Sequence, residues 1–280
     1  MNRATIAAVL CAALLTPASA ACNRPEQVSF PPGTTMDRIS RSGRLTVGVK
    51  ADQPGQGFRN LATGDYEGFD IEIAKIVAVA LGLTQRQISY EEIATNDRET
   101  ALKQGRVDIV VASYSITPER REQVGQAGPY YLTDQRLLVR EKDKDRIRSV
   151  ADVRHVWVCS VKGSTSARTI RTYTTRLIEE STYTPCIQRL LNRKVDVVTT
   201  DSVILHSYAA QQPDKLEVVG GSLRPEHWGI GYRKGDLAFC RFLTDTITKA
   251  VNNGDWRRAF DETLGRLGVP PPTEPTPEPC

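Results

Sequence analysis

The sequence predicts an α/β protein with two lobes, each a mostly parallel sheet flanked by helices. Strand and helix patterns alternate from about residue 41 to residue 267, and strands interleaved with helices of ordinary length are typical of parallel βαβ units. One strand-forming segment is repeated in residue type about 90 residues further along the chain. The length of 280 residues is enough for one large domain or two small ones.

The first half of the folded region alternates three strand patterns with two helix patterns. The helix that follows the first strand places Ile73, Val77 and Leu81 on one apolar stripe and ends at Gly82. In chain order we expect a strand at 45–49, a helix at 68–83, a strand at 88–93, a helix at 97–104 and a strand at 107–112.

An internal repeat predicts how the chain divides. Residues 101–110 (ALKQGRVDIV) match residues 189–198 (RLLNRKVDVV), and each segment combines a helix end, a tight basic turn and a buried strand. Two units of the same build predict two lobes. The expected limits are 41–136 plus 227–267 for lobe 1 and 137–226 for lobe 2. The helix pattern at 237–253 is expected to pack on lobe 1.

The first 21 residues are typical of an export signal. Arg3 gives a positive start, residues 4–15 are apolar, and residues 18–20 (ASA) form a small-residue cleavage pattern. About 20 apolar residues are needed to span a bilayer, and no later stretch approaches that length. We expect an exported protein with a Pro-rich tether at residues 22–40 and a polyproline-like tail at residues 268–280.

Cysteine parity bears on the new N terminus. Cys11 leaves with the signal, and five cysteines, an odd number, remain in an oxidising compartment. Cleavage after residue 21 exposes Cys22 for a thioether-linked lipid, although Ser19 stands where the lipoprotein motif usually has leucine. We expect Cys22 to be lipidated, so that the protein is anchored to the outer face of the cytoplasmic membrane. The alternative is cleavage after residue 20 and a secreted chain with a free or intermolecular thiol.

Composition and motifs exclude some function classes. The hydrophobic fraction of 40% and the charged fraction of 25% fit an ordinary globular protein. The net charge of +4 arises from 37 basic and 33 acidic residues that are scattered, so we expect no nucleic-acid partner. The histidines are isolated, and no zinc-protease, serine-hydrolase or Cys-x-x-Cys motif occurs. We therefore expect no enzyme, no metal and no cofactor.

Polar residues follow several strands where the predicted sheets end. Ligands of open α/β sheets bind at this edge, because helix N-termini point N–H groups and positive dipole ends into the crevice. Thr117 is expected to cap a helix with Pro118 at its first position. Arg120 in that first turn is unfavourable unless an anion lies beside it. Arg120 is therefore a candidate clamp for a carboxylate.

Two further junctions lie in the predicted second lobe. Residues 163–165 (GST) precede a helix expected at 167–177, and Gly163 allows a close approach of the backbone to an anion. Asp201 ends the repeated strand, where a carboxylate either caps the next helix or receives a cation. For Asp201 and Thr165 taken alone, an N-cap is the more common role.

Together these segments resemble a known family. The matching segments are Lys50 to Gly55, Gly68 to Asp70, Val107-Asp108, Ser113 to Ile116, Gly128 to Tyr130, Gly163 to Ser166, Thr200-Asp201 and Gly229 to Gly231. In order and spacing they are similar to the polar amino-acid-binding proteins of ABC importers, solute-binding protein family 3, and most resemble the glutamate-binding lipoproteins of actinobacteria. The resemblance implies a two-lobed periplasmic-binding-protein-like fold of type II, a monomer that binds an amino acid in the interlobe cleft, and an ABC permease as partner.

The resemblance also implies how the amino-acid head group is held. Asp201 receives the α-ammonium, helped by the Ser113 carbonyl and the Ser115 hydroxyl. Arg120 and the backbone N–H of Thr165 hold the α-carboxylate. The complete expected set of ligand-binding residues is Lys50, Gln53, Arg98, Ser113, Tyr114, Ser115, Arg120, Gly163, Ser164, Thr165 and Asp201.

Lys50 and Arg98 are expected to select the ligand side chain. Glutamine-binding relatives often have an acidic residue where this chain has Lys50, so a basic residue there suits a second carboxylate. Arg98 matches an arginine of glutamate and aspartate binders, and Gln53 is a weaker third candidate. We expect glutamate as the ligand, with aspartate, glutamine or asparagine as alternatives. The opposing interpretation is that Lys50 and Arg98 are solvated surface charges.

The four remaining cysteines are expected to form two disulfides. Four cysteines permit three pairings, of which we expect Cys159–Cys186 in the second lobe and Cys240–Cys280, which ties down the tail.

Two alternative functions are compatible with the same fold. One is an amino-acid sensor that signals to a membrane protein through the same cleft, and the other, less expected, is an enzyme, since a few family members are periplasmic dehydratases. Sequence does not separate a sensor from a transport component.

Overall fold

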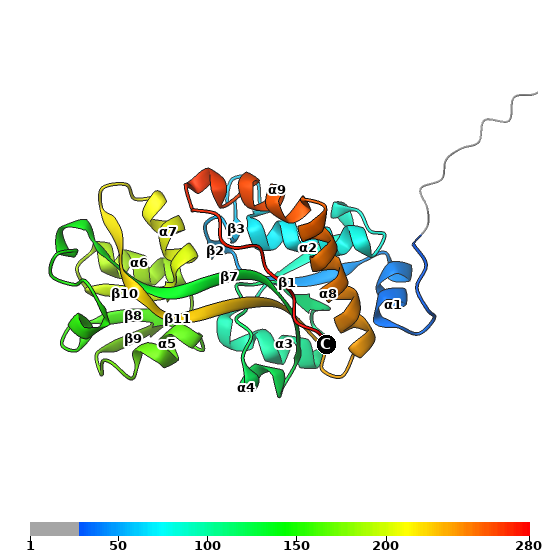
Figure 1. The fold of residues 1–280 in the computed structure, drawn as a ribbon, viewed down its shortest axis with the longest axis horizontal. Helices are drawn as coiled ribbons and strands as arrows, with labels where there is room; N and C mark the ends of the chain where they lie inside the picture. Colours follow the sequence, from blue (N-terminus) through cyan, green and yellow to red (C-terminus); the bar gives the residue numbers. More distant parts are fainter. Residues whose placement is uncertain (1–27) are drawn as a thin grey trace, which may run out of the picture.

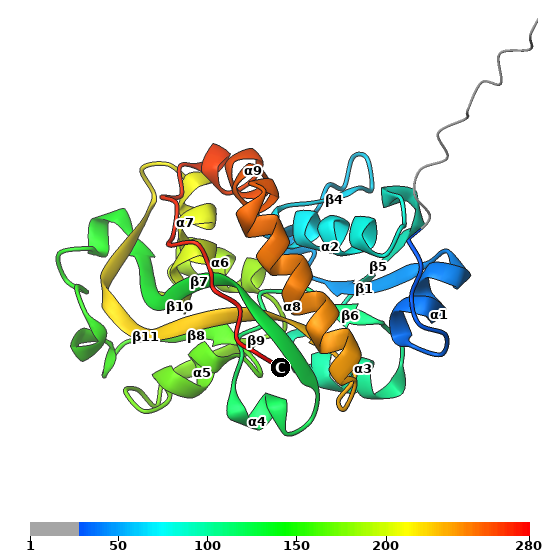
Figure 2. The same ribbon diagram turned by 45° about the vertical axis from the view of Figure 1, so that its right-hand side comes forward.

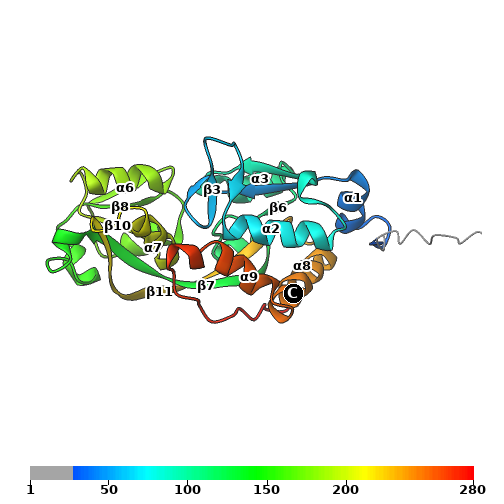
Figure 3. The same cartoon turned by 90° about the horizontal axis from the view of Figure 1, so that it is seen from above.

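The computed structural model describes residues 28–280, and the predicted signal peptide and lipidation site Cys22 lie outside the described residues. The chain forms two α/β lobes, as predicted, side by side in Figures 1 and 3. Two long antiparallel strands, β7 (Gly125–Arg140) and β11 (Leu216–Tyr232), connect the lobes. The expected lobe limits near residues 137 and 227 fall within these strands.

One eight-stranded sheet continues through both lobes in the order β5-β1-β6-β11-β7-β10-β8-β9. The outer strands of each lobe are parallel to one another, and β7 and β11 run antiparallel to their neighbours. These outer strands are β1 (Leu45–Val49), β5 (Ile88–Glu92) and β6 (Ile109–Val110) in lobe 1, and β8 (Val158–Val161), β9 (Leu177–Glu180) and β10 (Val197–Asp201) in lobe 2.

A second, three-stranded antiparallel sheet belongs to lobe 1 and was not expected from sequence. It consists of β2 (Asp52–Gln53), β3 (Gly57–Arg59) and β4 (Tyr66–Glu67). Its strands are too short to give an alternating pattern. Strand β2 contacts two helices of the other lobe.

The helices pack against the strands of their own lobe, and α8 and α9 return to pack against α2 of lobe 1. Lobe 1 contains α2 (Phe69–Ala80), α3 (Arg98–Gln104), α4 (Pro118–Arg121), α8 (Leu237–Asn252) and α9 (Asp255–Glu262). Lobe 2 contains α5 (Thr165–Ile170), α6 (Tyr183–Leu191) and α7 (Ser202–Ala210). Short 3₁₀ helices lie at Gln85–Gln87, Thr95–Asp97, Glu141–Asp143, Val150–Val153 and Gly265–Leu267. Helix α5 is shorter than expected, because a turn precedes β9.

Helix α1 (Thr35–Ser42) corrects the predicted tether at residues 22–40. Thr34 caps its N terminus through the backbone N–H of the third helical residue. Met36 and Ile39 are buried in the core of lobe 1. These two apolar side chains, three residues apart on one helical face, make this part of the segment an element of the fold.

The Pro-rich tail packs along the molecule and crosses β7 in Figure 2. Val269 is buried in the core, and the backbone N–H of Glu278 donates to the carbonyl of Gly128 at 2.7 Å. A disulfide joins Cys280 to Cys240 on α8, which confirms the expected pairing. The tail is therefore held at both ends against the folded part of the chain.

An aromatic cluster forms the core where β7 and β11 meet the helices of lobe 1. Tyr131 and Trp228 stack with 5.0 Å between ring centroids. Phe69 on α2 meets Tyr131 and Trp256 edge-on, at 5.3 and 5.6 Å. The indole N–H of Trp256 donates to the Tyr130 carbonyl at 2.7 Å, so this buried polar group is satisfied. The cluster packs against β7 and β11, the two strands that connect the lobes on either side of the cleft.

Candidate functional site

A small cavity of about 20 Å³ lies between the two lobes. Lobe 1 contributes Gln53, Thr95, Arg98, Ser113, Ser115 and Arg120, and lobe 2 contributes Ser164, Thr165, Ser166, Tyr183, Thr200, Asp201 and Ile204. This volume holds about one water molecule. The lobes are therefore closed on one another in this structure, and an amino acid can enter only if they separate.

Eight of the eleven residues expected to bind the ligand line this cavity, and three do not. Lys50, Tyr114 and Gly163 are the exceptions. Tyr114 and Gly163 contact the arginines that line the cavity, and Lys50 is bound to the carbonyl of Ile93, which does not line it.

Arg120 lies in the first turn of α4, as predicted, and faces the opposite lobe. Thr117 caps the helix by accepting from the Arg120 backbone N–H at 3.2 Å. The guanidinium donates to the Ser115 carbonyl at 2.8 Å and to the Gly163 carbonyl of lobe 2 at 3.2 Å. Burial, followed by the nearby charge of Arg98, lowers the pKa of Arg120 to about 10. An anion beside Arg120 would therefore stabilise a buried charge.

Arg98, at the start of α3, is held by backbone carbonyls of its own lobe. Its Nε donates to Thr95 at 3.0 Å, and its Nη1 donates to Ala112 at 3.0 Å and to Ser113 at 3.3 Å. Its Nη2 has no acceptor within residues 28–280. Arg98 is 2% exposed and lines the cavity, so the interpretation of this residue as a solvated surface charge is wrong.

Tyr114 lies beneath both arginines. Its ring centroid is 4.4 Å from the Arg98 guanidinium carbon and 5.0 Å from that of Arg120, which is cation–π geometry. The Tyr114 hydroxyl donates to Glu99 at 2.7 Å, and Glu99 lies 3.3 Å from Nε of Arg120. The tyrosine and the glutamate therefore fix the directions of two like charges.

Asp201 ends β10 and presents a buried carboxylate to the cavity. Its Oδ2 accepts from the indole N–H of Trp228 at 2.7 Å. Although Asp201 is in the N-cap position of α7, its side chain makes no cap hydrogen bond, so the N-cap interpretation is wrong. Burial and the carboxylate of Glu226 raise the pKa of Asp201 well above its usual range. A cation at this end of the cavity would relieve that cost.

The turn before α5 is capped by a different residue than expected. Ser164, rather than Thr165, is the N-cap, and its hydroxyl accepts from the Ala167 N–H at 2.9 Å. This leaves the Thr165 hydroxyl facing lobe 1, 3.5 Å from the Ser115 hydroxyl. Two hydroxyl groups from opposite lobes therefore meet at the cavity.

Gly163 brings the lobes together. Its φ is 79°, and a Cβ at this position would lie 2.8 Å from the Cβ of Asn96 in lobe 1. Such a distance is too short for two carbon atoms, so only glycine permits this approach. The sequence predicted that Gly163 lets the backbone approach an anion. In this structure Gly163 closely approaches Asn96 of lobe 1.

Lys50 is buried behind the cavity. Its ammonium group donates to the Ile93 carbonyl at 2.9 Å, and the residue is only 3% exposed. Burial, followed by the charge of Arg98, lowers the pKa of Lys50 to about 7. The surface interpretation is wrong for this residue too, and its position limits it to an indirect influence on a ligand.

Asp70 is a supporting residue to which the sequence gave no role. It is fully buried on α2, and its carboxylate accepts from the Ser113 N–H at 2.8 Å and from the Tyr130 hydroxyl at 2.7 Å. Burial raises its pKa to about 6. Asp70 holds Ser113 at a φ of 46°, which aims the Ser113 hydroxyl at Gln53. The Gly68-Phe69-Asp70 match was its only sequence signal.

Sequence reasoning missed six further residues. Thr95, Ser166, Tyr183, Thr200 and Ile204 line the cavity, and Glu226 lies near Asp201. Glu226 is 2% exposed, and its Oε1 has no hydrogen-bond partner within residues 28–280. Ser166 and Thr200 lie within the segments that match the family, and Thr95 lies three residues before Arg98. Tyr183 and Ile204 gave no signal, because tyrosine and isoleucine near a helix start are ordinary core residues.

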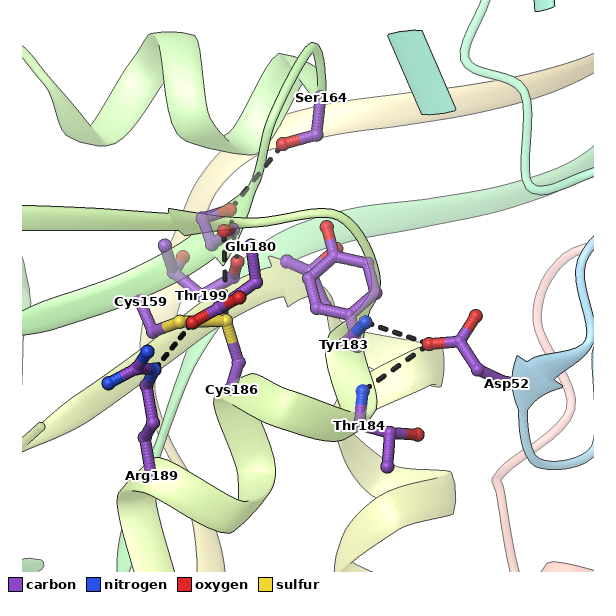
Figure 4. The surroundings of a disulfide bond; sticks show 11 residues. Asp52, Cys159, Ser164, Glu180, Tyr183, Thr184, Cys186, Arg189 and Thr199 are labelled. Carbon is purple, nitrogen blue, oxygen red and sulfur yellow. Dashed lines mark hydrogen bonds and ion pairs between the residues drawn. A yellow bond between two sulfur atoms is a disulfide. The ribbon is translucent and has the colours of Figure 1, made fainter. Parts of the chain in front are cut away.

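The helix that carries Tyr183 is fixed to its lobe by a disulfide. Cys186 on α6 is bonded to Cys159 on β8, as expected from sequence, and Figure 4 shows this bond beneath Tyr183. The Tyr183 hydroxyl accepts from Thr200 at 2.5 Å. This wall of the cavity is therefore covalently joined to the sheet of lobe 2.

The charges of the cavity match a zwitterion. Two guanidinium groups lie on the lobe 1 side, and a carboxylate lies on the lobe 2 side with a second acid behind it. Within residues 28–280 no group of acidic, histidine or cysteine side chains has the arrangement of a metal site. A two-lobed α/β fold with charged groups converging between the lobes defines a ligand-binding protein that closes around a small molecule.

The chain belongs to the bacterial extracellular solute-binding proteins, family 3, whose model matches residues 45–266. It is 35% identical to the glutamate-binding protein GluB of Corynebacterium efficiens, over 94% of this chain and 90% of that protein. It is 34% identical to the glutamine-binding protein of Geobacillus stearothermophilus, over 76% of this chain and 81% of that protein. An ancestral arginine-binding protein bound to glutamine has a similar structure, with a TM-score of 0.74 and 28% identity over 80% of this chain and 98% of that one.

The family is described as extracellular. No helix in residues 28–280 is long and apolar enough to cross a bilayer.

Proposed function

We propose that this protein is the substrate-binding component of an ABC importer and that it captures glutamate by closure of its lobes. The observation that supports this most is the placement of Arg98 and Arg120 on one wall of the cavity and of Asp201 on the other. Glutamate carries two carboxylates and one ammonium group. Its charges are thus complementary to those of the cleft.

The head group of the amino acid is assigned to residues from both lobes. Arg120 and the N–H of Thr165 hold the α-carboxylate, while Asp201 receives the α-ammonium with the Ser113 carbonyl and the Ser115 hydroxyl. A bidentate guanidinium suits a planar carboxylate. The Glu226 charge adds to the negative field at the ammonium end.

The γ-carboxylate is assigned to Arg98, with Gln53 beside it. Arg98 has one guanidinium nitrogen without an acceptor within residues 28–280 and lines the cavity. Lys50 lies behind this end without touching the ligand, and adds positive charge there when it is protonated. Glutamine lacks the second carboxylate, so it is expected to bind more weakly than glutamate.

Calorimetric titration with the twenty amino acids tests the proposal. Glutamate should bind with micromolar or better affinity, and aspartate and glutamine should bind more weakly. Tighter binding of glutamine than of glutamate would contradict the side-chain assignment. Absence of binding by every amino acid would contradict the proposed class of ligand.

Export and anchoring through Cys22 remain part of the proposal. Metabolic labelling with palmitate should tag the wild-type protein and leave Cys22→Ala untagged. Unlabelled wild-type protein in the medium would show that the chain is secreted instead.

A further inference from the structure

Strand β2 of lobe 1 makes polar contacts with helix α6 of lobe 2. The Oδ2 atom of Asp52 accepts from the backbone N–H of Tyr183 at 2.7 Å and of Thr184 at 3.3 Å. These are the first two residues of α6. Figure 4 shows the Asp52 carboxylate pointing at this helix end from the neighbouring lobe.

Helix α6 has no cap of its own. Its N-cap residue, Thr182, makes no side-chain cap hydrogen bond. The first N–H groups of a helix need acceptors and carry the positive end of the helix dipole. An acceptor for them therefore comes from the opposite lobe, and it carries the negative charge that this helix end favours.

A tyrosine of α7 completes the contact. The Tyr208 hydroxyl donates to the Asp52 carbonyl, lies 3.4 Å from Oδ2 and 3.1 Å from the Thr184 hydroxyl. Two helices of lobe 2 thus converge on one residue of lobe 1. Gln56, which follows β2, also reaches α7, donating to Ser207 at 3.0 Å.

The contact adjoins the ligand cavity without belonging to it. Asp52 does not line the cavity, whereas its sequence neighbour Gln53 and its partner Tyr183 do. The Cys159–Cys186 disulfide holds α6 to the sheet of lobe 2, so movement of α6 is movement of the lobe.

We propose that Asp52 is an interlobe latch: its carboxylate caps α6 only when the lobes are closed, and it stabilises the ligand-bound state irrespective of which amino acid is bound. This inference rests on the proposed function for its ligand and extends it to a residue that touches no ligand. Opening exposes the helix end and the carboxylate to water, and each ligand then binds more weakly because closure is less favourable.

Binding measurements on Asp52→Ala and Asp52→Asn test the latch. Asp52→Ala should weaken glutamate and glutamine by the same factor, about tenfold, since a carboxylate cap contributes about as much as one decade of affinity. Asp52→Asn keeps an acceptor without the charge and should lose less. Asp65→Asn, an exposed aspartate in the loop before β4, is the matched control and should bind as wild type does.

Two results would overturn the latch. One is affinity of Asp52→Ala within twofold of wild type, and the other is a loss confined to one ligand, which would indicate contact with the ligand side chain. Tyr208→Phe combined with Asp52→Ala should cost less than the sum of the single changes, because both act through one contact.

Hydrogen exchange separates failure of the latch from failure of the proposed function. The Tyr183 and Thr184 amides should exchange faster in Asp52→Ala than in wild type or Asp65→Asn, even without any amino acid present. If wild type binds no amino acid but these amides respond, the ligand assignment is wrong and the latch stands. Equal exchange rates in wild type and Asp52→Ala would overturn the latch whatever the ligand.

Discussion

The lobe 1 wall of the cleft carries two guanidinium groups, whereas the lobe 2 wall carries a carboxylate, hydroxyl groups and the starts of three helices. Arg98 makes all its hydrogen bonds within lobe 1. Arg120 divides its bonds between the Ser115 carbonyl of its own lobe and the Gly163 carbonyl of the other. Recognition of negative charge is thus built into one lobe, and contacts that depend on closure come from the other.

The difference between the two walls suggests that different contacts select the ligand and retain it. A guanidinium fixed by its own backbone needs little rearrangement to meet a carboxylate, which favours tight and selective binding. Contacts between the walls, at Gly163, Thr165 and Asp52, form only when the lobes meet. Changes at Arg98, which is bound only within lobe 1, are therefore expected to alter specificity, and changes at the interlobe contacts should alter all ligands alike.

The largest effect is expected from the two charges that bind the head group. Arg120→Ala or Asp201→Ala leaves a buried ligand charge without a partner, at a cost of about 3 to 5 kcal/mol. Calorimetry should show a loss of roughly a hundredfold or more for every amino acid. Arg121→Ala, a neighbour paired with Glu278 at the surface, is the control. Glutamate binding within tenfold of wild type in either variant would remove that residue from the head-group site.

A selective effect is expected from Arg98→Ala. A hydrogen bond to a charged group contributes about 1.5 to 3 kcal/mol, so glutamate should weaken by roughly tenfold to a hundredfold. Glutamine should weaken less, because its side chain is neutral. The ratio of the two affinities is the measurement, since any general damage to the fold affects both. Equal losses for both ligands would place Arg98 at the head group, and Arg106→Ala at the surface should change neither.

A smaller effect on binding is expected from Lys50→Met, since Lys50 acts from behind the cavity. Glutamate affinity should fall by less than in Arg98→Ala. Because the pKa of Lys50 falls from 10.5 to about 7 on folding, the unfolded chain binds more protons between these values, and wild-type stability rises with pH there. Thermal unfolding of Lys50→Met should lack this rise, which amounts to about 5 kcal/mol over the whole interval. Parallel pH profiles for the two proteins would contradict the buried, weakly basic Lys50.

The smallest effect on binding is expected from the tail. Replacing both Cys240 and Cys280 by serine should leave glutamate affinity within twofold, because neither residue lines the cavity. The free energy of unfolding should fall by about 3 to 4 kcal/mol in the chain-entropy account of disulfides. Loss of affinity together with stability would show that the tail acts on the cleft. It would then contradict the assignment of ligand binding to the residues of the two cleft walls alone.

Much of this molecule follows from local sequence patterns. The apolar stripe of α2, the Thr117-Pro118 start of α4 and the strand that ends at Asp201 were each predicted from neighbouring residues. Helix α1 was missed because it has only two buried side chains, Met36 and Ile39, and follows a Pro-rich segment that is typical of a tether. The short strands β2 to β4 were missed because two or three residues carry no period.

The sequence by itself determined which residue types stand at the strand ends, because caps, turns and strand periodicity are local. It also supplied the cysteines whose pairing proved to be Cys159–Cys186 and Cys240–Cys280. Only the tertiary structure decided that Lys50 lies behind the cavity, that Tyr114 supports two arginines and that Asp52 caps a helix of the other lobe. Each of these depends on the three-dimensional contact of segments far apart in the chain, and no periodicity or spacing records which of them meet.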